Sequence, residues 1–166
     1  MYCRVSLVQN RTITLITGSY DSGKTTALLA YLQEKNYPSH HLCGFVALAK
    51  AEKTCYRLKD LFSGEERLVL DEQVIPSGRK QGRFFVDDAV FVWANQKIFD
   101  HLGTATLAVF DELGKFELEG RGFDPSFKGA LAYPALDIVA TVRLSLLLEV
   151  IDHYALDGYD LVVQQV

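Results

Sequence analysis

Eight residues near the start of the chain have the types and spacing that bind a phosphate group. Gly18, Gly23, Lys24 and Thr25 occur as G-x-x-x-x-G-K-T, the pattern of a phosphate-binding P-loop. The glycines let the backbone fold tightly around an anion, and successive N–H groups point inward where a helix begins. In such a loop the lysine ammonium reaches the β- and γ-phosphates, and the threonine hydroxyl binds Mg²⁺. The pattern therefore predicts a site for a nucleoside triphosphate and Mg²⁺.

The segments on either side of this loop have the properties that a P-loop requires. Residues 12–17 are β-branched and apolar, which predicts a buried strand. Residues 26–33 favour a helix, which we expect to run to about Lys35. The residues expected to contact the nucleotide are Gly18, Ser19, Tyr20, Asp21, Ser22, Gly23, Lys24, Thr25 and Thr26.

Two adjacent carboxylates, Asp111 and Glu112, follow a second apolar segment at 107–110. Ligands of open α/β sheets bind beyond the carboxyl ends of the strands, so we expect this pair beside the P-loop. Asp111 is expected to hold Mg²⁺, through water or through Thr25. Glu112 is expected to orient and deprotonate a water in line with the γ-phosphate. The alternative interpretation is a solvated turn after a strand.

The rest of the chain alternates apolar strand-like segments with helical ones. This alternation predicts an α/β fold, a mostly parallel sheet flanked by helices, in one domain over residues 1–166. Residues of about 50–86 are expected to form an antiparallel hairpin insertion. Further strands are predicted at 43–49, 107–110, 136–142 and 161–163, and helices at 88–101, 125–131 and 144–154.

Composition argues against several classes of protein. The net charge of −4 is unfavourable for general nucleic-acid binding, and no apolar run is long enough to span a membrane. Cys3, Cys43 and Cys55 lack zinc spacing and are expected to be reduced thiols of a cytoplasmic protein. His40 and His41 follow Pro38 and are expected in an exposed loop rather than in a metal site.

The segment Asp111–Leu118 reads D-E-L-G-K-F-E-L. It resembles the D-E-[IL]-G-K-[MF]-E-L signature of the THEP1-like nucleoside-triphosphatases, and the similarity extends over about residues 12–143. The resemblance implies Mg²⁺-dependent hydrolysis of ATP or another nucleoside triphosphate, with Lys24 and Glu112 catalytic. It also implies that the strand ending at Thr141–Val142 lies between the P-loop strand and the strand ending at Asp111. The tip of that strand, Thr141 or Arg143, would face the γ-phosphate.

Two other basic residues are open to two interpretations each. Lys115 lies in the signature, where it would support charge near the γ-phosphate as a catalytic residue, or it is a solvated loop lysine. Arg121 lies between two glycines. It is either a mobile arginine that stabilises charge or part of a flexible surface loop. A partner protein or a second copy of the chain is a further candidate source of an activating arginine.

The sequence departs from the pattern of these proteins in two places. The interior of the P-loop, with Tyr20 and Asp21, is bulkier and more acidic than their usual small form. Asp21 beside a phosphate is unfavourable unless it faces away or contacts a partner. After Leu118 these proteins commonly have a serine followed by a phenylalanine, whereas here residues 119–124 intervene.

Two alternative functions share the same motifs. A small-molecule kinase would need an acceptor pocket and usually an arginine-rich lid, for which the insertion offers Arg67, Arg79 and Arg83. In a non-catalytic nucleotide-binding switch, Glu112 would activate water poorly. The chain has no guanine-reading N/T-K-x-D element, so ATP or mixed nucleotide use is favoured over strict GTP use.

Overall fold

A nine-stranded mixed β-sheet runs through residues 11–166, the part of the chain that the computed structural model describes. The strand order is β5-β6-β4-β3-β2-β7-β8-β1-β9. The strands are β1 (Thr12–Gly18), β2 (Leu42–Ala49), β3 (Cys55–Asp60), β4 (Glu66–Asp71), β5 (Arg79–Gln81), β6 (Phe84–Val86), β7 (Leu107–Leu113), β8 (Asp137–Arg143) and β9 (Asp160–Gln165).

The sheet has two regions that differ in strand direction. Strands β2, β7, β8, β1 and β9 pair in parallel. Strands β3, β4, β6 and β5 continue the sheet from β2 with antiparallel pairing. We call the first set the parallel region and the second the antiparallel insertion. The predicted fold class is therefore confirmed, including the insertion and the position of β8 between β1 and β7.

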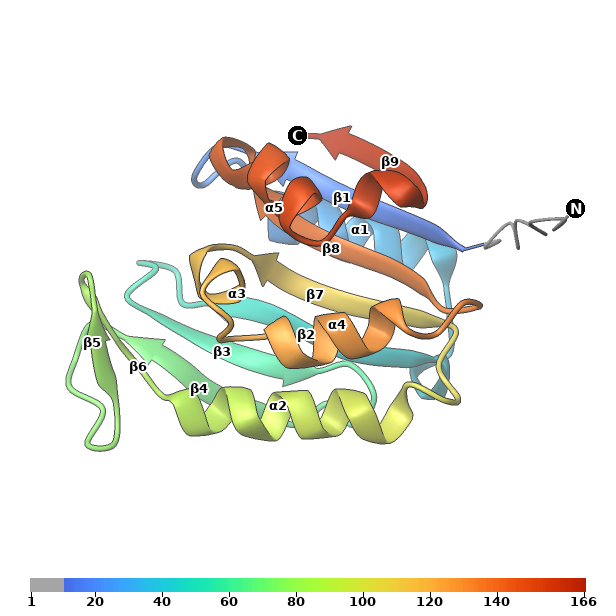
Figure 1. Cartoon of the computed structure of the whole chain (residues 1–166). Helices are drawn as coiled ribbons and strands as arrows, with labels where there is room; N and C mark the ends of the chain where they lie inside the picture. Colours follow the sequence, from blue (N-terminus) through green and yellow to red (C-terminus); the bar gives the residue numbers. More distant parts are fainter. Residues whose placement is uncertain (1–10) are drawn as a thin grey trace, which may run out of the picture.

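Helices cover both faces of the sheet (Figure 1). Helix α1 packs on one face, and α2, α3, α4 and α5 lie on the other. Their bounds are α1 (Lys24–Lys35), α2 (Asp88–His101), α3 (Lys115–Leu118), α4 (Asp124–Leu131) and α5 (Leu147–His153). Three short 3-10 turns lie at Ser39–His41, Leu144–Leu146 and Leu156–Gly158.

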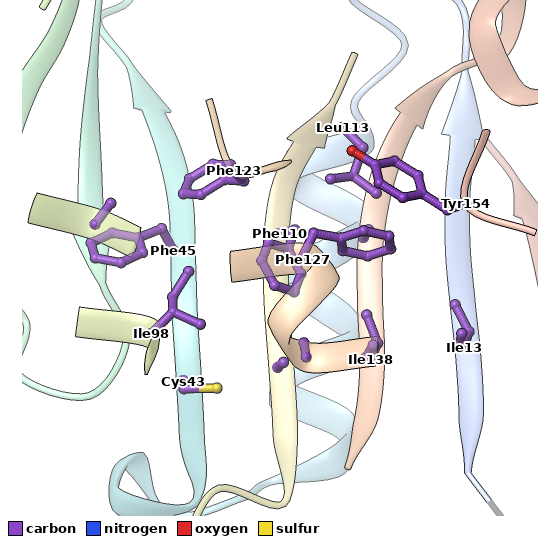
Figure 2. Packing of buried hydrophobic residues seen from close by; sticks show 14 of the residues in the cluster. Ile13, Cys43, Phe45, Ile98, Phe110, Leu113, Phe123, Phe127, Ile138 and Tyr154 are labelled. Atoms are coloured by element: carbon purple, nitrogen blue, oxygen red, sulfur yellow. The ribbon is translucent and has the colours of Figure 1, made fainter. Parts of the chain in front are cut away.

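The buried strands separate two hydrophobic cores because their side chains alternate between the faces. Ala108 and Phe110 face the larger core, under α2, α4 and α5, whereas Leu107 and Val109 face the smaller core under α1. In the larger core, rings from distant segments pack edge to face, as between Phe110 and Phe127 at 5.1 Å (Figure 2). Continuous apolar runs in the sequence reflect this burial on both sides.

The predicted elements agree with the structure except at some ends. Helix α2 begins after Asp87, whose side chain accepts a hydrogen bond from the Ala89 amide as expected for an N-cap. The helix predicted at 144–154 starts as a 3-10 turn, and the α-helix itself spans only Leu147–His153. Strand β5 and helix α3 were not predicted, because each has no more than four residues and no clear period.

The other minor predictions have mixed outcomes. His40 is exposed in a 3-10 turn. Cys43 and Cys55 are buried free thiols, and burial raises the pKa of Cys43 to about 12, whereas Cys3 lies outside the described residues. Within residues 11–166, no helix has both the length and the apolar composition needed to cross a membrane.

Candidate functional site

The P-loop connects β1 to α1, so its backbone amides meet the N-terminus of that helix. Gly23 has a φ of +89°, a conformation that a residue with a side chain adopts only under strain, and it turns the chain into α1. Lys24 is the first residue of α1 and is buried, and its ammonium donates a hydrogen bond to the Ser19 carbonyl over 2.9 Å. The lysine therefore lies across the loop, where the pattern requires it.

Asp111 joins the P-loop to the neighbouring strands. One carboxylate oxygen accepts hydrogen bonds from the Thr25 hydroxyl at 2.9 Å and from the Ala47 amide at 3.0 Å. The other accepts one from the Thr141 hydroxyl at 2.6 Å. Burial raises the pKa of Asp111, and these hydrogen bonds and the charge of Lys24 oppose that effect. Asp111 is thus fixed by α1, β2 and β8 at once.

The pair formed by Thr25 and Asp111 fits Mg²⁺. This cation prefers oxygen ligands and is usually held by one or two carboxylates together with substrate phosphates and water. A hydroxyl and a carboxylate oxygen 2.9 Å apart, next to the P-loop, supply a donor set of that kind. Bound there, the cation would neutralise charge on the β- and γ-phosphates.

A β-bulge in β7 brings Glu112 into the same site. Phe110 is paired with Ala140, but Leu113 is paired with Val142, so β7 has an extra residue at the position of Asp111 and Glu112. In a regular strand these neighbours would point to opposite faces, whereas here both carboxylates line one cavity. The pKa of Glu112 is raised by burial, against the charges of Lys24 and Arg143.

Arg143 lies at the end of β8, facing Glu112. The shortest distance between its guanidinium and the Glu112 carboxylate is 3.8 Å. Its Nε is buried without a hydrogen-bond partner in the described part of the chain. Arg121, by contrast, pairs with Glu119, lies over the Phe116 ring and does not line the cavity. Of Arg121 and Arg143, the two arginines considered as charge-stabilising residues, only Arg143 reaches the carboxylates.

The unusual P-loop residues Tyr20 and Asp21 contact the antiparallel insertion. Arg83, in the turn between β5 and β6, donates a hydrogen bond to the Tyr20 hydroxyl over 3.1 Å. The Arg143 guanidinium lies 5.4 Å from the centre of the Tyr20 ring. Asp21 forms an ion pair with Lys53 in the β2–β3 loop. Lys53 is thus the partner that we expected Asp21 to need because of its place beside a phosphate.

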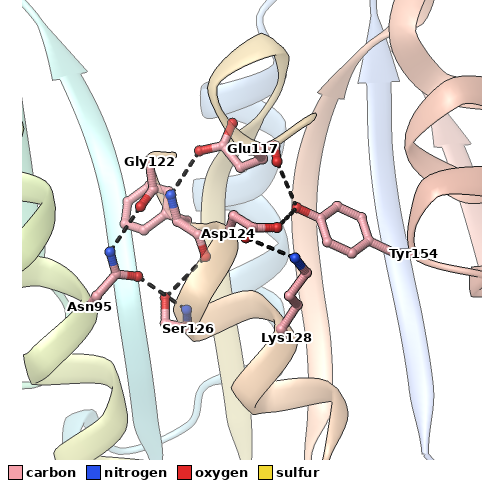
Figure 3. Close-up of polar contacts among 8 residues, drawn as sticks. Asn95, Glu117, Gly122, Asp124, Ser126, Lys128 and Tyr154 are labelled. Carbon is pink, nitrogen blue, oxygen red and sulfur yellow. Dashed lines mark hydrogen bonds and ion pairs between the residues drawn. The ribbon is translucent and has the colours of Figure 1, made fainter. Parts of the chain in front are cut away.

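The segment at 119–124 is held by Glu117, a buried carboxylate of α3 (Figure 3). Its two oxygens accept hydrogen bonds from the amides of Gly114, at 2.8 Å, and Phe123, at 2.9 Å. Gly122 has a φ of +59°, and a Cβ there would lie 2.1 Å from the Glu117 carboxylate. Asn95 of α2 donates to the Gly122 carbonyl over 2.8 Å. These contacts place Phe116 and Phe123 at the cavity.

Most of the residues predicted for the site line one cavity of about 710 Å³. Lys115 is exposed at the start of α3 rather than in a loop, and it lines this cavity. Gly18 and Ser19 belong to the P-loop but do not line the cavity. The predicted residues that line it are Tyr20, Asp21, Ser22, Gly23, Lys24, Thr25, Thr26, Asp111, Glu112 and Lys115, together with Arg143.

The sequence did not identify the contribution of the insertion. Lys53, Tyr56, Arg83 and Phe84 also line the cavity. The arginines of the insertion were considered only as material for a kinase lid, and the sequence did not distinguish Arg83, which contacts the P-loop, from Arg79, which pairs with Asp88.

Comparison with known proteins is consistent with this geometry. The model of a family described as NTPase matches residues 13–161. The chain belongs to this NTPase family. The resemblance to THEP1-like proteins is confirmed, and the crystal structure of THEP1 from the hyperthermophile Aquifex aeolicus has a similar fold. Their TM-score is 0.70 and their identity 19%, over 92% of this chain and 88% of that one. No curated protein matches the chain.

Proposed function

We propose that the protein hydrolyses nucleoside triphosphates to diphosphate and phosphate with the help of Mg²⁺. The observation that carries this proposal is the contact between Thr25 and Asp111, in one cavity with Lys24 and Glu112. A phosphate-binding loop, a pair of Mg²⁺ ligands and a second carboxylate to act as a base are the parts that such hydrolysis requires.

Each residue has a role that follows from its position. Lys24 and the P-loop amides bind the β- and γ-phosphates. Glu112 orients a water molecule toward the γ-phosphorus and accepts its proton, because a carboxylate beside the phosphate is a suitable general base. Thr141 does not touch the nucleotide in this scheme and instead positions the Asp111 carboxylate through its 2.6 Å hydrogen bond.

Arg143 is the internal cation that supports the transition state in this proposal. Its guanidinium already faces Glu112 and lines the cavity, and its buried Nε is without a partner in the described residues. An arginine that stabilises the equatorial oxygens of a transferring phosphoryl group contributes much of the rate in this class of enzyme. We expect turnover below about 1 s⁻¹, as in other P-loop proteins that lack an arginine supplied by a partner.

The test is phosphate release from ATP, GTP, CTP and UTP, with Mg²⁺ and with a chelator, for the parent and for Lys24→Ala. The parent should release phosphate only with Mg²⁺, and the variant should bind ATP poorly while its melting temperature without nucleotide barely changes. Equal ATP affinity in the two proteins would show that the phosphate site is wrongly assigned.

A further inference from the structure

The cavity extends well beyond the groups that bind phosphate. From the P-loop it passes the ends of β2 and β7 and continues over β3 and β4 to the β5–β6 hairpin. Its volume of about 710 Å³ is within the range of small-molecule sites, about 300–1,000 Å³. Part of this volume would be filled by the nucleotide itself, so the lining of the extension, rather than its size, indicates what else binds there.

The wall of this extension is apolar and largely aromatic. Tyr56 of β3 packs edge to face against Phe84 of β6, with 5.7 Å between ring centres. Phe91 of α2 packs in the same way against Phe116, at 6.0 Å. The side chains that line the extension are Tyr56, Leu58, Val69, Leu70, Phe84, Phe91, Phe116 and Phe123. We call this set the aromatic pocket.

The β5–β6 hairpin closes the aromatic pocket on the side that faces away from the core of the sheet. Figure 1 shows this hairpin at the same end of the molecule as the P-loop, beyond the carboxyl ends of β7 and β8. The hydrogen bond from Arg83 to Tyr20 connects the hairpin directly to the P-loop. Lys53, Arg83 and Lys115 add positive charge at the rim.

The aromatic pocket begins next to Glu112, on the side where the attacking group must lie. Contacts join the pocket to Glu112: Arg143 lies 3.8 Å from that carboxylate and 5.4 Å from the centre of the Tyr20 ring, and Arg83, which is hydrogen-bonded to Tyr20, lies 4.8 Å from the centre of the Phe84 ring. The P-loop and Lys24, which would hold the phosphates, line the same cavity. A molecule in the aromatic pocket would therefore have an open path past Glu112 to the γ-phosphorus.

We propose that the aromatic pocket binds a second substrate, a small aromatic compound with a hydroxyl group, and that this hydroxyl accepts the γ-phosphoryl group in place of water. Aromatic walls favour a ring, which stacks edge to face or offset against them. Glu112 requires an O–H group from which to take a proton. The inference rests on the proposed function, because it uses the same phosphate site and the same general base.

The transfer step balances without any further reactant. The acceptor oxygen forms a bond to the γ-phosphorus, and the bond from that phosphorus to the β,γ-bridging oxygen breaks. The bridging oxygen leaves with the electron pair on the nucleoside diphosphate, and the acceptor proton moves to the Glu112 carboxylate. Hydrolysis is then the same step with water as the acceptor.

The experiment uses the full chain, ATP labelled at the γ-phosphate, Mg²⁺ and a panel of aromatic alcohols: pyridoxine, benzyl alcohol, adenosine, guanosine, cytidine and uridine. Thin-layer chromatography measures the ratio of labelled phosphoester to free phosphate. Saturation-transfer NMR without nucleotide measures binding of each alcohol by itself. We expect at least one member of the panel to bind saturably and to give a labelled ester.

Substitutions then locate the site. Leu70→Trp places a larger ring in the aromatic pocket, and Leu148→Trp makes the same change on α5, where residue 148 is 80% exposed and outside the cavity. Leu70→Trp should lower both acceptor binding and the ester-to-phosphate ratio by about tenfold, a loss of about 1.4 kcal/mol. Leu148→Trp should change neither. If Leu70→Trp does not fold, Phe84→Ala removes one face of the wall and tests the same loss.

The outcomes separate this inference from the proposed function. Absence of saturable binding across the panel, or binding that Leu70→Trp and Phe84→Ala leave unchanged, would overturn the aromatic pocket as a substrate site. Saturable binding with all label in free phosphate would overturn the acceptor role. Binding that Leu70→Trp abolishes, in a protein that releases no phosphate from any nucleotide, would support the pocket and overturn the proposed hydrolysis.

Discussion

The two sides of the cavity come from the two regions of the sheet, and they differ in chemistry. The parallel region contributes Lys24, Asp111, Glu112 and Arg143, all at or beyond the carboxyl ends of its strands. The antiparallel insertion contributes apolar walls from β3, β4 and β6 and has its cations only at the rim. Reacting groups and the surface that would select a second molecule thus lie on separate parts of the fold.

This difference implies a division of effects. Substitutions in the parallel region should change the rate of phosphoryl transfer, because their side chains face the phosphates. Substitutions in the insertion should change what binds and how tightly, because they leave the charged groups in place.

Glu112→Gln should separate binding from hydrolysis. Glutamine keeps the size of the side chain but loses its basicity, so phosphate release should fall by about 10²–10⁴-fold. MgATP should still bind, since Lys24, Thr25 and Asp111 remain, and isothermal titration calorimetry measures this directly. Turnover within about threefold of the parent would remove Glu112 from the catalytic role.

Asp111→Asn is the matched comparison, since it changes the adjacent carboxylate on the same bulge. It should weaken Mg²⁺ dependence and nucleotide affinity together, because the Mg²⁺ ligand loses its charge. If the two variants gave the same defect, the separate roles of the two carboxylates would be wrong.

Arg143→Ala should lower turnover by about 10²-fold, the usual loss when one cation or donor that faces the transition state is removed. Single-turnover phosphate release measures the effect. Arg121→Ala is the control, because Arg121 pairs with Glu119 and does not line the cavity. Equal losses in both variants would contradict the assignment of Arg143.

Glu117 should make the stability of the protein depend on pH. Burial raises its pKa from 4.5 to about 7, so between these values the folded chain holds a proton that the unfolded chain has released. Its contribution to stability is therefore present below about pH 4.5 and is lost as the pH rises through about 7, a change of about 3 kcal/mol.

Glu117→Gln does not titrate and is the reference for that measurement. Urea unfolding at pH 4.5 and at pH 8 gives the free energy of unfolding of both proteins. The parent should lose about 3 kcal/mol relative to the variant between the two pH values. A difference that is constant with pH would show that the Glu117 carboxyl has the same pKa in the folded and the unfolded chain.

Arg83→Ala should have the smallest effect of these variants. Arg83 and Arg143 both contact Tyr20, one from the insertion and one from the parallel region. Loss of Arg83 removes an exposed hydrogen bond, worth about 1 kcal/mol, so KM for ATP should rise by about fivefold with kcat nearly unchanged. A loss of kcat as large as that of Arg143→Ala would contradict the division between the regions.

The sequence predicted the polar side of the cavity because its signals are local. A phosphate-binding loop and an acidic pair after an apolar strand are short patterns, and the position of strand ends in an α/β sheet then brings them together. The bulge that turns both Asp111 and Glu112 into the cavity was not predictable, since it shows only in the pairing of β7 with β8.

The apolar side could not be predicted for a physical reason. Tyr56, Phe84 and Phe116 come to line one cavity only after three segments far apart in the chain have packed, and each alone resembles ordinary core. The partners of Tyr20 and Asp21 could not be predicted for the same reason, because Arg83 is 63 residues from Tyr20 in the sequence.

The contacts of Tyr20 and Asp21 have a consequence for related chains. Two residues inside the P-loop and two in the insertion, Lys53 and Arg83, form one unit held by an ion pair and a hydrogen bond. Chains with small residues at positions 20 and 21 have no such contacts to keep, so positions 53 and 83 are free to lose their charge. These four positions are therefore expected to change together during evolution, as a co-varying set that links the phosphate loop to the hairpin.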